Sequence, residues 1–170
     1  MKLTKNINIL TKKEFLSIFG NIFEKSDWIA DEVFNLKPFK DSNDLVFKMM
    51  NVYEKTSNEQ IRIILKLHPK LAVEKKLTFF SSNEQSNAKL NTCTNEELEE
   101  FKNLNLTYEK KFKFPFIIAV KGKNKKEILN NFRQRIKNDL QEEFNEAKLQ
   151  VKKIALFRLN EVLNINYENI

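Results

Sequence analysis

The fold is decided most clearly by residues 140–163, which read LQEEFNEAKLQVKKIALFRLNEVL. Apolar residues recur in this stretch at helical spacings, at Phe144, Ala147, Val151, Ile154, Ala155 and Val162. An α-helix has 3.6 residues per turn, so this spacing places them on one face. The stretch therefore predicts a long amphipathic helix from about Leu140 to Leu163.

Arg158 interrupts the apolar face of this helix. It lies four residues after Ile154 and four before Val162. A charge at such a position is costly unless a partner or a polar pocket compensates it. Two interpretations are equally open: a structural salt bridge to a nearby carboxylate, and a contact with a bound ligand.

Helical periodicity dominates the rest of the chain as well and predicts a mainly helical fold. Capping-box spacing marks four helix starts, at Thr11, Ser57, Thr94 and Asn124. Two more helices are predicted, a short one carrying Trp28 and Val33 and another from about Asp44 to Lys55. With 170 residues, 41% of them hydrophobic, we expect a single compact domain over residues 1–170.

One apolar run does not fit the helical pattern. Residues 114–120 read FPFIIAV, a run that contains Pro115 and is followed closely by Gly122. It is too short and too β-branched for a helix and is better explained as a buried extended segment, Phe114–Val120. Its backbone polar groups must then find partners in the protein or in a ligand.

His68 occupies a conspicuous position at the end of a predicted helix. The helix that starts near Ser57 carries Ile61, Ile64, Leu65 and then His68 on one face, and Pro69 follows at once. Proline disfavours helical geometry in the residue before it, so His68 is predicted at or just beyond the helix end. Such a place is typical of an active-site side chain, although a buried histidine bonded to the backbone is the simpler interpretation.

Residues 81–85, SSNEQ, predict two overlapping helix starts. Ser81 with Glu84 and Ser82 with Gln85 both have capping-box spacing. In the simpler interpretation Glu84 only closes a capping box. A functional role for Glu84 needs further support.

Cysteine and histidine counts exclude several chemistries. Cys93 is the only cysteine and His68 the only histidine, so one chain can form neither a disulfide nor a zinc site of several Cys or His ligands. Magnesium or calcium bound by carboxylates stays open on these counts, but no acidic loop has a calcium-binding spacing. We therefore expect no metal.

The net charge of +7 suggests nucleic acid as a partner, but the composition argues against it. Lysines number 26 against 4 arginines, and arginine is the preferred residue for bidentate phosphate and base contacts. Residues 1–6 read MKLTKN and lack the apolar stretch of a signal peptide, and no apolar run could cross a bilayer. We expect a soluble cytoplasmic protein that binds neither nucleic acid nor membranes.

Five blocks of the sequence resemble the 2-oxo-4-hydroxy-4-carboxy-5-ureidoimidazoline (OHCU) decarboxylases. The order and spacing of the blocks carry the resemblance through almost the whole chain. They are residues 22–30 (IFEKSDWIA), 68–72 (HPKLA), 81–85 (SSNEQ), 112–120 (FKFPFIIAV) and 154–159 (IALFRL).

The chain departs from the family pattern at four positions. Lys70 replaces the usual aspartate, and Val73, Lys89 and Lys113 stand where glycines are common. These changes affect loop conformation more than chemistry, because the family's His, Glu, Gln and Arg positions are all filled. Lys89 and Lys113 could nevertheless alter the rim of the pocket and the substrate preference.

The resemblance implies a cofactor-free enzyme of urate breakdown that decarboxylates OHCU to (S)-allantoin. In that reaction His68 would deliver a proton, Glu84 would hold the histidine or the substrate hydroxyl, and Arg158 would pair with a substrate oxygen. Gln85 would bond ring or ureido groups. The pocket implied is lined by Pro69, Ser81, Ser82, Asn83, Glu84, Gln85, Phe116, Ile117, Ile118, Ala119, Val120 and Arg158.

The resemblance also implies an all-α domain of about seven or eight helices, which agrees with the periodicity. It implies a homodimer as well, which nothing in the periodicity shows. Two alternatives stay open. One is an enzyme of the same fold that acts on another small ureido or imidazoline compound, and the other is a basic helical module that binds nucleic acid or a protein.

Overall fold

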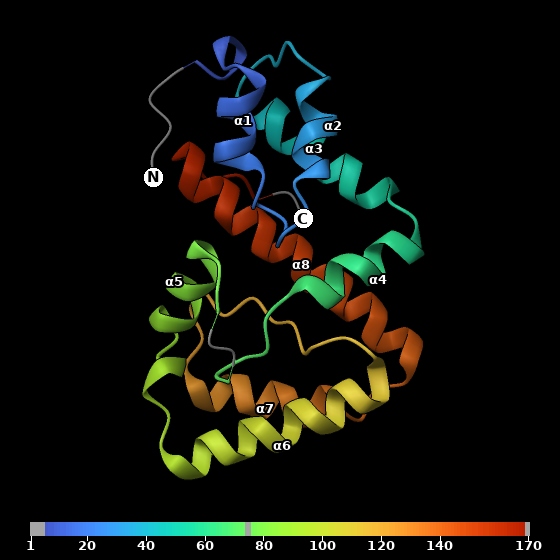
Figure 1. Cartoon of the computed structure of the whole chain (residues 1–170), viewed down its shortest axis with the longest axis vertical. Coiled ribbons are helices and arrows are strands. Elements are labelled where there is room, and N and C mark those ends of the chain that lie inside the picture. Colours follow the sequence, from blue (N-terminus) through green and yellow to red (C-terminus); the bar gives the residue numbers. More distant parts are fainter. Residues whose placement is uncertain (1–5, 74–75, 169–170) are drawn as a thin grey trace. The chain divides into compact units, whose positions relative to one another are not determined.

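The computed structural model of the chain describes residues 6–73 and 76–168 and is all-helical over them (Figure 1). These residues form eight α-helices and two short 3-10 helices, η1 (Ile7–Ile9) and η2 (Leu90–Thr92), and contain no strand. The all-α prediction is confirmed. The part of the N-terminal sequence before residue 6, used above to argue against a signal peptide, lies outside the described residues.

The chain divides into two compact units. The terminal unit comprises the described residues up to Ile64 together with those from Lys152 onward, and the central unit is Leu65–Val151. Two helices, α4 (Asn58–Leu67) and α8 (Leu140–Leu163), contribute residues to both. One domain over residues 1–170 stays a prediction.

Most of the predicted helices are confirmed. The bounds of α8 match the prediction, and α2 (Trp28–Phe34) and α3 (Ser42–Lys55) lie where the periodicity places them. Complete capping boxes start α1 (Lys12–Phe19), α6 (Asn95–Phe112) and α7 (Lys125–Arg135). At the start of α4, Ser57 Oγ accepts from the backbone N–H of Gln60 at 3.3 Å, as its spacing predicts.

The predicted helix starts at Ser81 and Ser82 are wrong. Helix α5 (Phe79–Asn87) begins earlier, because Thr78 has extended backbone and its side chain accepts from the N–H of Ser81. Thr78 has no Glu or Gln three residues later, so it forms only half a capping box. Ser81 and Glu84 consequently lie inside the helix, and capping does not explain Glu84.

In the terminal unit, α1, α2 and α3 pack around an aromatic core. Phe15 contacts Phe19, Phe34 and Phe39 at ring-centroid distances of 4.7 to 6.0 Å. Burying a side chain such as Phe15 stabilises the fold by roughly 1.5–3 kcal/mol.

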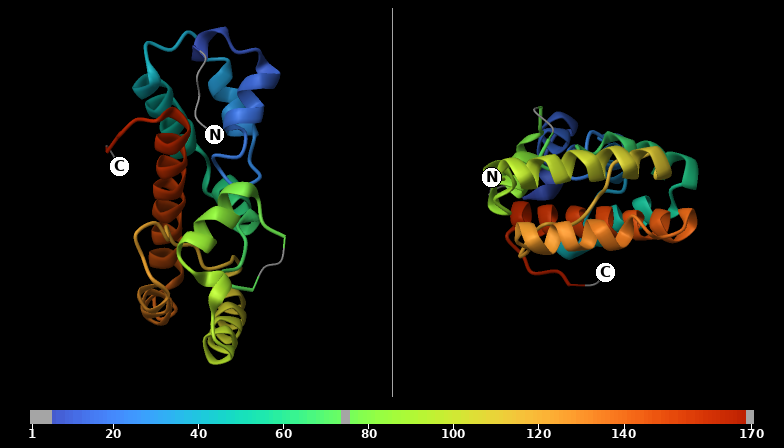
Figure 2. Two further views of the ribbon diagram at one scale, coloured as in Figure 1. Left: turned by 90° about the vertical axis from the view of Figure 1, so that its left-hand side faces the viewer. Right: turned by 90° about the horizontal axis from the view of Figure 1, so that it is seen from below.

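In the central unit, α6 and α7 lie side by side (Figure 2) and flank the predicted extended run. After α6 the chain has neither helix nor strand from Pro115 to Val120, and every residue from Phe114 to Val120 is buried. The Phe116 ring stacks on Phe132 of α7 at 3.9 Å. It also meets Tyr108 of α6 edge-on. The prediction of a buried extended segment is confirmed.

Left-handed backbone explains why glycine is common at positions where this chain carries lysine. Lys89 (φ 58°) and Lys113 (φ 65°) both have positive φ, as does Ala72 (φ 63°). Lys113 ends α6 there. An L-residue in this conformation costs about 1–2 kcal/mol, which glycine avoids.

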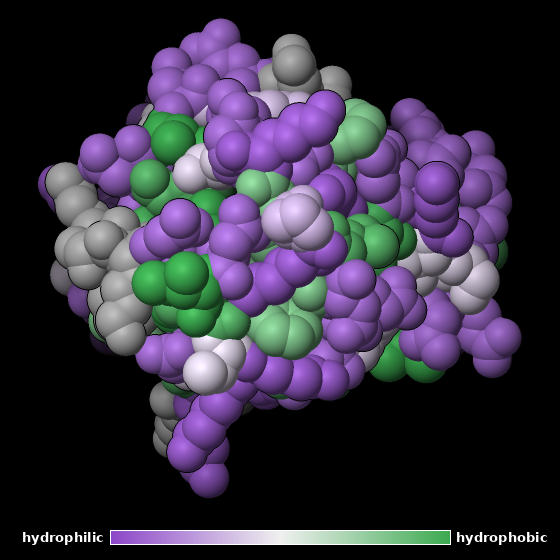
Figure 3. Space-filling model, turned by 90° about the horizontal axis from the view of Figure 1, so that it is seen from above, coloured by the Kyte–Doolittle hydropathy of each residue, from purple (hydrophilic) through white to green (hydrophobic). Residues whose placement is uncertain are grey.

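The surface is mainly hydrophilic, with apolar patches between polar residues on the face drawn in Figure 3. Large exposed apolar side chains in the described chain are Ile9, Leu36, Phe47, Ile63, Phe79, Leu106, Leu140 and Leu149. Within the described residues, no helix combines the length and the apolar character that a membrane span requires.

Candidate functional site

His68 lies immediately after α4, as predicted from Pro69. Its backbone N–H donates to Leu65 O at 3.3 Å, which closes the last turn of the helix. His68 as a whole residue is only 8% exposed, and Pro69 is half-buried. The histidine is therefore held on a short turn, largely shielded from solvent.

The turn after His68 is fixed by two buried amide side chains. Asn105 of α6 donates through Nδ2 to Leu71 O at 3.2 Å, and the N–H of Ala72 donates to Gln85 Oε1 at 3.0 Å. Both bonds fall on a single peptide unit, whose carbonyl and N–H point in opposite directions. The left-handed Ala72 is thus held by α5 and α6 together.

The predicted site residues on α5 differ in burial according to the face of the helix on which they lie. Ser81 and Gln85, four residues apart, are buried, Glu84 is half-buried, and Ser82 and Asn83 are exposed. Gln85 Nε2 is buried and has no hydrogen-bond partner among the described residues. A buried donor without a partner costs about 1–3 kcal/mol, so this amide is suited to a ligand acceptor.

Lys70, which replaces the family's aspartate, forms an ion pair with Glu109 of α6 at 2.8 Å. Both side chains are more than a third exposed, so the pair contributes at most about 1 kcal/mol. Lys70 thus has a structural explanation in the central unit.

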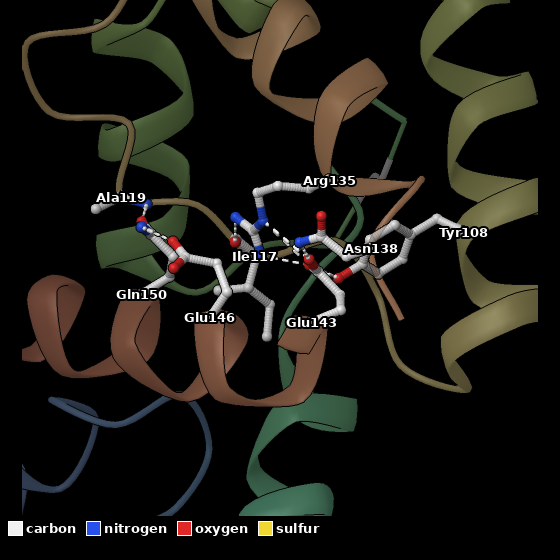
Figure 4. A network of polar contacts seen from close by, with 8 residues as sticks. All are labelled: Tyr108, Ile117, Ala119, Arg135, Asn138, Glu143, Glu146 and Gln150. Atoms are coloured by element: carbon white, nitrogen blue, oxygen red, sulfur yellow. Dashed lines mark hydrogen bonds and ion pairs between the residues drawn. The ribbon is translucent and has the colours of Figure 1, made fainter. Parts of the chain in front are cut away.

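Two side chains hold the backbone of the Phe116–Val120 run, as Figure 4 shows. Arg135 Nη1 donates to Ile117 O at 2.8 Å, and the N–H of Ala119 donates to Gln150 Oε1 at 2.8 Å. The partners that this buried segment was expected to need are therefore provided partly by α7 and α8.

Arg158 belongs to the terminal unit and forms an ion pair with Glu24. Its Nη1 lies 3.1 Å from Glu24 Oε2 and also donates to the carbonyls of Asn21 and Ile22. Glu24 is therefore the carboxylate that the structural interpretation of Arg158 requires. The ion pair joins two of the five sequence blocks, residues 22–30 and 154–159.

A groove of about 640 Å³ lies elsewhere in the terminal unit. None of the predicted site residues lines it. Its walls come from Trp28, Glu32, Leu36, Lys48, Asn51, Val52, Lys55, Thr56, Ser57 and Gln60. Over residues 6–73 and 76–168 no cluster of three His, Cys, Asp or Glu side chains is placed to hold a metal ion.

Comparison with known proteins identifies the family. The family described as OHCU decarboxylase matches residues 8–160 of the chain. The chain belongs to the OHCU decarboxylase family. A "Uric acid degradation bifunctional protein" of Bacillus sp. (strain TB-90) is 39% identical over 97% of this chain but only 33% of its own length. The chain thus spans about a third of that relative.

Two further relatives of this OHCU decarboxylase family member are matched over most of the chain. A 2-oxo-4-hydroxy-4-carboxy-5-ureidoimidazoline decarboxylase of Haloferax volcanii is 33% identical over 92% of this chain and 94% of its own length. The crystal structure of an (S)-allantoin synthase superposes with a TM-score of 0.72 at 28% identity. It covers 91% of this chain and 51% of the synthase chain.

Several buried polar residues that hold the backbone of the candidate site segments in this family member are not among the predicted residues. Asn105 lies on the buried face of α6 between Phe101 and Tyr108, and Arg135 lies three residues after Phe132 of α7. Glu143 and Gln150 are likewise buried polar residues on α8. The signal that could identify them is a polar residue on an apolar helix face, the same signal that singles out His68 and Arg158.

Proposed function

We propose that the chain decarboxylates OHCU to (S)-allantoin in urate breakdown without a cofactor. Family membership supports the reaction. The observation that carries it is the buried His68 on a turn fixed by Gln85, whose Nε2 remains a buried donor without a partner in the described chain. A proton donor and an unused amide donor on linked elements suit a small, oxygen-rich substrate.

The chemistry needs orientation and a proton rather than a cofactor. When CO2 leaves, the electron pair of the broken C–C bond stays on the ring, where the ring carbonyl and imine delocalise it as an enolate-like anion. His68 then gives a proton to one face of the neighbouring ring carbon, which bears the ureido group. The hydroxyl on the carbon that lost CO2 becomes a ring carbonyl as its proton passes to the ring nitrogen that took up the charge. Histidine suits this role, since its ordinary pKa lies nearest to neutral pH. Protonation on a single face yields one allantoin enantiomer.

The other site residues orient the substrate. Gln85 Nε2 donates to a ring or ureido oxygen, and the half-buried Glu84 on the same helix holds His68 or the substrate hydroxyl. Ser81 and the Phe116–Val120 backbone line the pocket with Pro69. For Ser82, Asn83 and a substrate contact of Arg158, only the resemblance to the family provides support.

The proposed function is tested by assaying the chain with a panel of small ring compounds. It includes freshly generated OHCU, its precursor in urate oxidation, and other ureido or imidazoline compounds, with CO2 release as the readout. We expect turnover of OHCU above its spontaneous decay and none of the others. Turnover of a different compound would establish the alternative of a related enzyme with another substrate. Salt-dependent binding of DNA or RNA without any turnover would favour the basic binding module.

The family resemblance also supports a homodimer in the cytoplasm. Exposed apolar side chains such as Phe47 on α3 and Phe79 on α5, which are 54% and 66% exposed, supply surface for such an interface. Light scattering at micromolar concentration tests the dimer, which predicts twice the chain mass of 20.2 kDa.

A further inference from the structure

A buried ion pair in the central unit joins α7 to α8. Arg135 of α7 and Glu143 of α8 have side chains that are 9% and 0% exposed. The Arg135 Nη2 atom lies 2.5 Å from Glu143 Oε1, and Nε also donates to this carboxylate. Tyr108 and Asn138 donate to the same carboxylate, so Glu143 is held from α6, from α7 and from the turn between α7 and α8 (Figure 4).

The guanidinium of Arg135 divides its donors between two partners. Nε and Nη2 face Glu143, while Nη1 donates to Ile117 O at 2.8 Å. The same group lies over the Phe116 ring, with Cζ 4.5 Å from the centroid. Arg135 therefore contacts two successive residues of the Phe116–Val120 run, and Glu143 fixes the plane of the guanidinium. A lysine, with a point charge, could not reproduce this fork.

Near its C-terminal end, at Ala119, the run is held by a side chain of α8. Gln150 accepts the N–H of Ala119 and donates through Nε2 to Glu146 at 2.7 Å. The run contains neither helix nor strand, so side chains of α7 and α8 hold its backbone in place of regular hydrogen bonds. A backbone that lacks regular hydrogen bonding keeps one conformation only if such contacts define it.

We propose that Arg135 is a positioning residue that sets the backbone of Phe116–Val120 for substrate binding. The inference rests on the proposed function in one respect, namely that this run lines the substrate pocket. Stability alone gives little reason for the arrangement, because a buried ion pair is often no more stable than apolar residues of similar volume. The contacts of Arg135 with Phe116 and Ile117 support a different reason, namely that Arg135 controls the backbone conformation of a substrate-binding segment.

Arg135→Lys separates positioning from stability. Lysine keeps the charge beside Glu143 but cannot serve both Glu143 and Ile117 O. We expect KM for OHCU to rise about ten- to a hundredfold, with a smaller fall in kcat and a largely retained melting temperature. The matched control is Arg133→Lys, two residues earlier on α7, where an exposed arginine forms a forked pair with Glu100 at 2.6 and 2.8 Å. We expect the control to leave KM unchanged.

If Arg135→Lys does not fold, the double variant Arg135→Met with Glu143→Leu provides the test. It removes both charges together, so no buried charge is left without a partner, while Ile117 O still loses its donor. We expect this variant to fold and to show the same rise in KM.

Amide hydrogen exchange provides a readout that does not depend on activity. We expect exchange at Ile118 and Ala119 to become at least about tenfold faster in Arg135→Lys and to stay unchanged in Arg133→Lys. Unchanged exchange would overturn the positioning role, and faster exchange with an unchanged KM would overturn its link to substrate. If the parent chain has no decarboxylase activity, the proposed function fails, and exchange alone then decides whether Arg135 positions the run.

Discussion

Arg158 Nη1 lies 3.1 Å from Glu24 Oε2, and the two side chains are 2% and 1% exposed. Removal of one partner from such a pair leaves the other charge buried. We predict that Arg158→Met lowers the free energy of unfolding by roughly 3–5 kcal/mol because Glu24 is then left without its arginine. Urea denaturation measures this loss, and adding Glu24→Leu should restore much of it. A single Met variant as stable as the parent would contradict the structural role.

Arg158→Lys tests whether the arginine also contacts substrate. Lysine keeps the charge near Glu24, so we expect a folded protein. If the guanidinium also contacts substrate through an oriented hydrogen bond, the point charge of lysine cannot replace it, and most turnover is lost. Turnover and melting temperature are measured on the same preparation. A fully active Lys variant would remove Arg158 from the substrate site.

His68→Asn removes the proposed proton donor but keeps a polar side chain at the end of α4. Proton-transfer groups commonly contribute about 10²- to 10⁴-fold in rate, so we predict a fall in kcat of that size. Circular dichroism should show unchanged helical content, because only the residue after the helix is altered. Near-full activity in this variant would exclude His68 from the mechanism.

Lys113→Gly should stabilise the protein. Lys113 has φ 65° at the end of α6, and glycine removes the steric cost of that conformation. Part of the gain is offset by the greater freedom of glycine in the unfolded chain, which leaves about 0.5–1 kcal/mol. The matched control is Lys110→Gly inside the same helix, which should destabilise by about 1 kcal/mol. Thermal unfolding of both variants tests the left-handed conformation, and a loss of stability in both would contradict it.

We predict that the protein loses stability at alkaline pH, because two of its tyrosines are buried. Burial raises the pKa of Tyr53, and burial together with the nearby Glu143 carboxylate raises the pKa of Tyr108, both far above the ordinary value. The folded protein therefore keeps these protons where the unfolded chain releases them. Stability is fully present below about pH 10 and falls above it, by about 1.4 kcal/mol per pH unit for each tyrosine.

Urea denaturation between pH 8 and pH 11.5, roughly spanning the ordinary tyrosine pKa of about 10, measures this effect. Above pH 10, Tyr53→Phe should make the free energy of unfolding fall less steeply with pH, by the contribution of one tyrosine, about 1.4 kcal/mol per pH unit. The same slope in parent and variant would contradict the assignment to Tyr53.

The sequence predicted the parts of the fold that local patterns determine. The bounds of α8 follow from the sequence because a long apolar face repeats there, and the position of His68 follows from the geometry of Pro69. The start of α5 was missed because Thr78 forms only a partial cap. Asn105 and Arg135 were missed because their partners, Leu71 and Ile117, lie 34 and 18 residues away, and only the folded chain brings them together.

The most direct test of the central claim is the stereochemistry of the allantoin formed from freshly generated OHCU. Circular dichroism or chiral chromatography follows the product while the chain is present in catalytic amount. The account predicts a large excess of (S)-allantoin, formed faster than in buffer, because His68 protonates one face of the ring anion. Racemic allantoin formed at the uncatalysed rate would contradict it.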